Sequence, residues 1–182
     1  MKKSTGTQTQ LELVGGVIKK LNALGIEPVL IGGMALVILG SRRVTQDFDF
    51  VVSSFGDKIV EVLKIFYDAG LELVTKFNDK GDVVATLNNQ VIAKVRLQVD
   101  QPVSCYFYNF KNDLKIDLLF DFPIPVTELL KEAHKKKINK QSFVIASENH
   151  LLQLKQIAKS SRQKSGDGDD IEFLQNLHHD KN

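Results

Sequence analysis

The chain has 182 residues, the length of one domain, and its 43% apolar and 25% charged residues are typical of a folded globular protein. Twenty-four Lys and Arg against 22 Asp and Glu leave a net charge of +2, which argues against a globally basic nucleic-acid coat protein. The single cysteine, Cys105, excludes an internal disulfide, and no apolar run approaches the ~20 residues of a membrane span. We therefore expect a cytoplasmic globular protein without membrane association.

The first part of the sequence predicts helices alternating with short strands. Polar residues 1–10 are expected to be frayed, and the spacing of apolar residues then predicts a helix from Leu11 to Leu24. After it we expect a buried strand at Pro28–Ile31, a Gly-Gly turn into a helix at Met34–Leu39, a strand at Asp47–Val52 and a helix at Asp57–Ala69.

The middle of the chain is predicted to be rich in strands, and the last part returns to helix. The expected strands are Glu72–Phe77, Val83–Asn88, Val91–Val99, Ser104–Phe110 and Leu114–Phe120. These strands are followed by a predicted helix over Val126–Lys137, which has a lysine cluster at its end. After it we expect a short strand at Phe143–Ala146 and helices at Glu148–Ser161 and Asp169–Leu177. Strands without long helices between them indicate antiparallel pairing.

This order of elements predicts an α+β fold with a mixed, largely antiparallel sheet flanked by helices, with further helices at the C-terminal end. No linker separates two independent units, so we expect a single domain over residues 1–182. Its core is expected at about residues 11–146 and a helical C-terminal part at about 147–178.

Three carboxylates are the main candidates for chemistry. Asp47 and Asp49 are two residues apart on a predicted strand, so both side chains project from one face. Neighbouring carboxylates repel each other unless a cation lies between them, and magnesium prefers such hard oxygen ligands. Asp117 lies in an otherwise apolar strand, where an unpaired carboxylate is costly. If the two strands are neighbours, the three acids form a site for one or two metal ions.

The Gly32-Gly33 pair predicts a binding site for phosphate. A strand that turns through two glycines into a helix presents backbone N–H groups at the positive end of the helix. Between this turn and the first acids lie Ser41, Arg42 and Arg43, whose side chains can donate hydrogen bonds to phosphate. Each feature alone also has a purely structural explanation, and only the combination in this order and spacing favours a nucleotide site.

Taken together, these motifs resemble the nucleotidyltransferase superfamily of polymerase-beta type. Its signature is a Gly-Gly or Gly-Ser pair, then Asp-x-Asp or Asp-x-Glu about a dozen residues later, and a third Asp on a later strand. Three features resemble a small bacterial branch of this superfamily. They are the form Arg43-x-Thr45-x-Asp47-Phe-Asp49, the Leu154-Lys155 helix, and the run Arg162-x-Lys164 followed by Asp167-x-x-Asp170. That branch includes toxins of abortive-infection toxin–antitoxin pairs, and some antibiotic nucleotidyltransferases are similar in the same segment.

The resemblance implies a magnesium-dependent transfer of a nucleoside monophosphate from a nucleoside triphosphate to an acceptor hydroxyl. It implies that Asp47 and Asp49 hold the nucleotide-bound metal, and that Asp117 binds a second metal or acts as the base. Gly32, Gly33, Ser41, Arg43 and Lys155 are the expected contacts to the nucleotide, with Arg43 and Lys155 as the cations that face the triphosphate.

The sequence leaves the acceptor open between tRNA, a protein side chain and a small hydroxylated molecule, and it does not identify the preferred nucleotide or an antitoxin partner. A second interpretation is a nucleotide-binding module with weak or no catalysis that acts through a protein or RNA partner. A third, a nucleic-acid-binding regulator that uses the lysine cluster, is disfavoured by the nearly neutral net charge.

Overall fold

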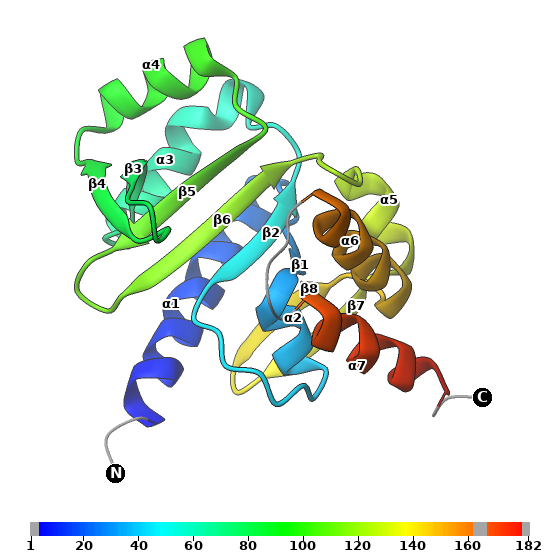
Figure 1. Cartoon of the computed structure of the whole chain (residues 1–182). Helices are drawn as coiled ribbons and strands as arrows, with labels where there is room; N and C mark the ends of the chain where they lie inside the picture. The colour runs from blue at the N-terminus through cyan, green and yellow to red at the C-terminus, as the bar shows by residue number, and fades with distance from the viewer. Residues whose placement is uncertain (1–3, 162–166, 180–182) are drawn as a thin grey trace.

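The computed structural model describes residues 4–161 and 167–179, and it confirms the predicted α+β class (Figure 1). The strands are β1 Val29–Ile31, β2 Phe48–Val52, β3 Glu72–Phe77, β4 Val83–Leu87, β5 Ser104–Asn109, β6 Leu114–Phe120, β7 His134–Ile138 and β8 Gln141–Ile145. The helices are α1 Ser4–Ala23, α2 Gly32–Ile38, α3 Ile59–Asp68, α4 Gln90–Asp100, α5 Val126–Glu132, α6 Glu148–Ser161 and α7 Asp167–His179, with a 3₁₀ turn η1 at Gly56–Lys58. No helix of the described residues is long and apolar enough to cross a membrane.

All eight strands belong to one mixed sheet in the order β4-β3-β5-β6-β2-β1-β8-β7. The β3–β4 and β5–β6 pairs are antiparallel, as predicted for the middle of the chain, whereas β2 pairs with β6 in parallel. In Figure 1, α1 passes behind the central strands, α3 and α4 lie at the end of the sheet near β3 and β4, and α5, α6 and α7 lie at the other end.

One face of the central strands is packed into the apolar core. Side chains alternate along a strand, and the alternate residues Phe48 and Phe50 of β2 and Phe107 of β5 are fully or almost fully buried. Phe66 of α3 stacks on Phe107 with ring centroids 4.0 Å apart. Cys105 is buried on the same face. The opposite face of these strands carries Asp49 of β2, Ser104 and Tyr106 of β5, and Lys115 and Asp117 of β6.

The prediction of a strand at Val91–Val99 is wrong, because these residues belong to the helix α4. The apolar residues alternate along this segment, but the side chains of Ala93 and Leu97, four residues apart, are the ones that are buried. The helix is fixed at its start by Asn89, whose side chain accepts hydrogen bonds from the backbone N–H groups of Val91 and Ile92 at 2.9 and 3.2 Å.

Two predicted helix boundaries are also wrong. The first helix begins at Ser4 rather than at Leu11, so part of the segment expected to be frayed is helical. The helix predicted over Val126–Lys137 ends at Glu132, and the lysines that follow lie on β7, an edge strand paired with β8. Lys135, Lys136 and Lys137 are exposed there, which is a common way of protecting an edge strand from pairing with another chain.

Candidate active site

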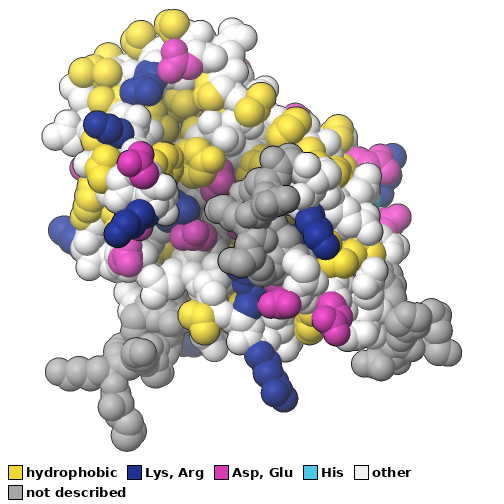
Figure 2. Space-filling view, viewed as in Figure 1, with side chains coloured by type: hydrophobic (Ala, Val, Ile, Leu, Met, Phe, Trp, Pro, Cys, Tyr) yellow, Lys and Arg dark blue, Asp and Glu magenta, His cyan; other side chains and the backbone are white. Residues whose placement is uncertain are grey.

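A pocket of about 580 Å³ lies over the polar face of the central strands. Its lining includes seven of the residues that the sequence singled out: Gly32, Gly33, Arg43, Asp47, Asp49, Asp117 and Lys155. The structure therefore brings together the start of α2, the loop before β2, the strands β2 and β6, and the helix α6. Figure 2 shows acidic and basic side chains close together around a hollow near the middle of this face.

The three acids come from neighbouring strands, as the sequence required. Asp49 lies between the buried Phe48 and Phe50 and therefore projects from the opposite, polar face of β2. Asp117 of β6 is its direct partner in the parallel register, so the two carboxylates project side by side. Asp47, which immediately precedes β2, lies on the same face and is about half exposed.

Lys115 is a member of this cluster that the sequence interpretation missed. It precedes Asp117 by two residues on β6, so its side chain lies on the same face, and its Nζ is 2.9 Å from a carboxylate oxygen of Asp47. Burial opposes the charge of the ammonium group, but the hydrogen bond to Asp47 and the negative charges of the three acids outweigh burial and raise the pKa of Lys115. The two-residue spacing from Asp117 was the signal that could have identified it.

The two glycines are required by close contacts within the pocket. Gly32 has a φ of +68°, and a Cβ atom built there would lie only 2.0 Å from an oxygen of Asp49. A Cβ atom at Gly33 would lie 2.9 Å from the guanidinium carbon of Arg43. The turn into α2 therefore lies directly against one acid and one cation of the candidate site.

A buried acid of α7 joins the two cations that we expect to face a triphosphate. Asp170 has a side chain only 5% exposed, and it forms ion pairs with Arg43 and with Lys155, whose Nζ lies 2.6 Å away. The sequence interpretation quoted Asp170 as part of a motif but gave it no role. Arg162 and Lys164 of the same motif, and the side chain of Asp167, lie outside the described residues.

Ser41 is the one expected nucleotide contact that does not line the pocket. It lies in the loop after α2, and its hydroxyl oxygen accepts a hydrogen bond from the backbone N–H of Arg43 at 3.4 Å. In this structure the side chain of Ser41 therefore contacts the backbone of its own loop, next to Arg43, and not the pocket.

The pocket also has an apolar wall, which the sequence did not indicate. Phe77 and Tyr106 contact each other edge to face, with ring centroids 5.0 Å apart. Leu119, Phe122 and Ile157 also line this part of the pocket, and the side chains of Phe122 and Ile157 are partly exposed. The pocket therefore combines a charged floor with apolar surface that suits an organic ligand.

The donor set suits a divalent cation, although the described residues contain no group of three or more His, Cys, Asp or Glu side chains already arranged to hold a metal ion. Asp49 and Asp117 offer neighbouring hard oxygen donors from adjacent strands. Asp47 forms an ion pair with Lys115 through one carboxylate oxygen, so its second oxygen is the one that could become a third ligand without loss of that ion pair.

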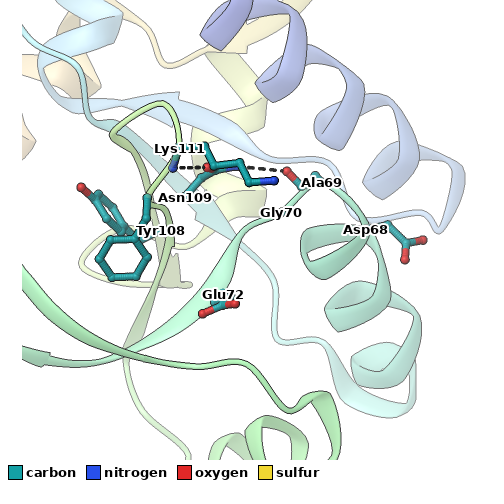
Figure 3. A pocket seen from close by; sticks show the side chains of 8 residues that line it. Asp68, Ala69, Gly70, Glu72, Tyr108, Asn109 and Lys111 are labelled. Carbon is teal, nitrogen blue, oxygen red and sulfur yellow. Dashed lines mark hydrogen bonds between the residues drawn. The ribbon is translucent and has the colours of Figure 1, made fainter.

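A second pocket, of about 380 Å³, lies at the end of α3 beside the β5–β6 hairpin (Figure 3). The amide of Asn109 there donates a hydrogen bond to the carbonyl of Ala69 at 3.3 Å, and its oxygen accepts one from the backbone N–H of Lys111 at 2.9 Å. Asn109 thus connects the end of α3, at Ala69, to the β5–β6 hairpin by hydrogen bonds. None of the residues predicted for the site lines this pocket.

We expect Gly33→Val to weaken nucleotide binding strongly while leaving the chain folded. Its added side chain must displace the guanidinium of Arg43, a flexible group, whereas the backbone of Gly33 has no positive φ that a side chain would strain. Nucleotide affinity, measured by calorimetry, should fall at least about tenfold, the effect of losing one charged contact.

The matched control is Gly16→Val in α1, where an added Cβ atom meets nothing within 4 Å. This variant should bind nucleotide as the original chain does. Global unfolding of Gly33→Val in circular dichroism would show instead that the turn is structural, and our assignment of Gly33 to phosphate binding would be wrong.

No family model and no curated protein sequence matches this chain, but solved structures do. An antigenic nucleotidyltransferase-like protein from Paracoccidioides brasiliensis is similar over 92% of this chain and 76% of its own, at 20% identity and a TM-score of 0.55. The lincosamide antibiotic adenylyltransferase LnuA, solved with lincomycin bound, is similar over 90% of this chain and 95% of its own, at 10% identity and a TM-score of 0.56.

The third structure is that of ANT(2")-Ia in complex with adenylyl-2"-tobramycin. It is similar over 95% of this chain and 92% of its own, at 14% identity and a TM-score of 0.57. The chain therefore has the nucleotidyltransferase fold, which confirms the fold that the sequence motifs implied.

Proposed function

We propose that this chain is a magnesium-dependent nucleotidyltransferase that moves a nucleoside monophosphate from a nucleoside triphosphate to an acceptor hydroxyl. The observation that carries the proposal is the side-by-side placement of Asp49 and Asp117 in a pocket that also contains the Gly32-Gly33 turn. The fold supports it, since the similar structures include a lincosamide antibiotic adenylyltransferase and a protein in complex with an adenylylated tobramycin. We further propose that residues 1–182 act as one domain, because a residue of α7 contacts both cations of the site.

In this proposal the triphosphate lies over the Gly32-Gly33 turn. The backbone N–H groups at the start of α2 have no side-chain cap and can donate to phosphate oxygens. Arg43 and Lys155 line the same pocket and provide positive charge for the β- and γ-phosphates. We expect Ser41 to contribute by positioning the loop that carries Arg43, and to contact the nucleotide only if the loop moves.

The acids would hold Mg²⁺, with Asp47 and Asp49 on the nucleotide side and Asp117 next to the acceptor. One or two metal ions held by these residues would neutralise charge on the reacting phosphate oxygens. In the proposed reaction the acceptor hydroxyl would attack the α-phosphorus, the new oxygen–phosphorus bond would form as the bond to pyrophosphate breaks, and Asp117 would accept the hydroxyl proton. The protein contributes mainly orientation and charge placement.

A small hydroxylated molecule is the acceptor that we favour. Two of the similar structures contain lincomycin and an adenylylated tobramycin, and the apolar wall of Phe77, Tyr106 and Phe122 offers surface for an organic acceptor. The resemblance of the motifs to toxin nucleotidyltransferases keeps tRNA and protein as alternatives, with an antitoxin as partner. A neighbouring antitoxin-like reading frame in the genome would favour the toxin role.

One observation favours the second candidate function, a nucleotide-binding module without efficient catalysis. Lys115 forms an ion pair with Asp47 and neutralises part of the acidic cluster, and the described residues contain no group of three or more His, Cys, Asp or Glu side chains arranged to hold a metal ion. In such a module nucleotide binding would not depend on a divalent metal, and the chain would act through a protein or RNA partner.

Calorimetric titration with a nucleoside triphosphate distinguishes the two functions. The enzyme should bind it with Mg²⁺ and at least about tenfold more weakly in EDTA, because the acids and the phosphates repel each other without a cation between them. Incubation with α-labelled nucleotide should then label an acceptor among pooled tRNA, whole-cell protein and small hydroxylated compounds. Equal affinity in both conditions, together with no labelled product, would contradict the enzyme and favour the module.

A further inference from the structure

One row of facing residues crosses the polar face of the sheet, from the turn into α2 to an aromatic pair. Ile31, the residue before the turn, is paired with Asp49 in the strand register, and Asp49 is paired with Asp117. Asp117 is paired in turn with Tyr106 of β5, whose ring contacts that of Phe77 of β3. Figure 1 shows β2, β6 and β5 of this row side by side. The aromatic pair, Tyr106 and Phe77, therefore lies next to Asp117, on the side away from the turn into α2.

The geometry of nucleotidyl transfer gives the two ends of this row different partners, a step that rests on the proposed function. In an in-line displacement the attacking oxygen approaches the phosphorus from the side opposite the leaving oxygen. In the proposed function the leaving pyrophosphate lies over the turn into α2, where Arg43 and Lys155 line the pocket. The acceptor hydroxyl therefore has to approach from the other end of the row, where Asp117 and the aromatic pair lie.

The charged side chains of the pocket already have partners or roles before an acceptor binds. Among the described residues that line it, three of the four acids are the proposed metal ligands, and the fourth, Asp170, pairs with Arg43 and Lys155. The third cation of this lining, Lys115, pairs with Asp47. These described residues therefore leave neither carboxylates for the ammonium groups of a polyamine nor cations for the phosphates of a nucleic-acid acceptor.

The acceptor end of the pocket is lined mainly by uncharged side chains. Next to Tyr106 on the same face of β5 lies Ser104, which is paired with Leu119 of β6. The aromatic pair and Leu119 are partly buried, and Phe122 is 52% exposed, so a ligand can reach their apolar surface. Aromatic side chains of this kind contact the apolar face of a ring, while a few polar groups such as the Ser104 hydroxyl fix its orientation.

We infer that Tyr106 and Phe77 form the subsite for the acceptor, and that the acceptor is an uncharged hydroxylated molecule with an apolar ring face. Its ring packs against the aromatic pair while its hydroxyl lies at Asp117, which takes the proton as the hydroxyl oxygen bonds to the α-phosphorus and pyrophosphate leaves. Tyr106 is a specificity-determining residue, because its ring contacts the acceptor and not the nucleotide. A nucleobase on the aromatic pair is the competing assignment, and the two differ in whether acceptor and nucleotide can bind together.

Saturation-transfer NMR tests this subsite with phenyl β-D-glucoside as the uncharged ring-bearing alcohol and tobramycin as a polycation. The glucoside should bind the original chain together with Mg²⁺ and α,β-methylene-ATP, a nucleotide whose α–β bridge cannot be cleaved, and tobramycin should bind at least about tenfold more weakly. Tyr106→Ala should weaken glucoside binding about tenfold because it removes the ring, whereas Tyr106→Phe keeps the ring and should bind as the original chain does. The matched control is Tyr108→Ala, two residues further on the same face of β5, where the hydroxyl donates a hydrogen bond to Asp113 and the side chain does not line the pocket.

Phe77→Ala, at the end of β3, should have the same effect as Tyr106→Ala, and circular dichroism melts check that both variants remain folded. Glucoside that the nucleotide displaces, or that Tyr106→Ala binds unchanged, would overturn the inference, and so would tighter binding of tobramycin. Calorimetric titration with α,β-methylene-ATP separates this result from the proposed function. A chain that binds no nucleotide contradicts the proposed function, whereas a chain that binds nucleotide with Mg²⁺ but no glucoside contradicts only the acceptor subsite.

Discussion

Asp117→Asn is expected to reduce nucleotidyl transfer on the order of 10²–10⁴-fold, the usual effect of removing a positioned base, while the chain remains folded. The substitution keeps the volume of the side chain and removes its charge. Asp117 projects beside Asp49 from the adjacent strand, so the metal-free chain loses a carboxylate repulsion along with the charge. Thermal melts in EDTA should therefore show a melting temperature equal to or higher than that of the original chain.

Asp121→Ala is the matched control for a structural acid on the same stretch of chain. Asp121 follows β6 directly, and its carboxylate accepts a hydrogen bond of 2.9 Å from the backbone N–H of Val126 at the start of α5. It does not line the pocket. Its loss removes a hydrogen bond from a backbone N–H to a carboxylate and should cost roughly 1–3 kcal/mol, while the transfer rate stays nearly unchanged.

The reverse result for Asp117 would contradict our assignment. If Asp117 only satisfies buried donors, its replacement by Asn should lower the free energy of unfolding by roughly 1–3 kcal/mol through a lost charged hydrogen bond. A clear drop in melting temperature with label transfer intact would therefore assign Asp117 to the structure and not to the reaction.

Asp170→Asn is expected to have the largest effect on stability. It removes the anion that Arg43 and Lys155 share, and it leaves Lys155, whose side chain is only 12% exposed, without that partner. Removing one partner of a buried ion pair costs roughly 3–5 kcal/mol, and the partial exposure of Arg43 places the expected loss at about 2–3 kcal/mol. The control Asp169→Asn, at an exposed neighbour on α7, should leave the melting temperature unchanged.

A nucleoside triphosphate should restore part of this lost stability if Arg43 and Lys155 face its phosphates. The ligand then supplies the negative charge that Asp170 no longer provides, so the gain in melting temperature on adding nucleotide with Mg²⁺ should be larger in Asp170→Asn than in the original chain. An equal or smaller gain would mean that the two cations serve only to attach α7, and the phosphate role of Lys155 would then be wrong.

The sequence predicted most of the fold because its strong signals agreed with tertiary packing. Buried strands such as Leu114–Phe120 alternate apolar residues around Asp117, and the structure keeps those bounds. The expected adjacency of the strands that carry Asp49 and Asp117 is confirmed by their register. Whether these residues bind metal and nucleotide remains a prediction.

The errors arose where local pattern and tertiary packing differ. Apolar residues alternate from Val91 to Val99 and so match a strand, but they form a helix with apolar residues on two faces, of which only one is covered by its own chain. The residues after Glu132 continue a helix-like pattern, yet pairing with β8 makes them a strand. Lys115 and Asp170 were missed because each gains its partner only from a distant part of the chain.

The parallel pairing of β2 with β6 also affects how the site can form. Parallel neighbours cannot be joined by a tight turn, and here the connection between them contains α3, β3, β4, α4 and β5. Contacts between residues so far apart in the chain form slowly, because a long loop must close first. We therefore expect the carboxylates of Asp49 and Asp117 to meet late in folding, after the elements between them have formed.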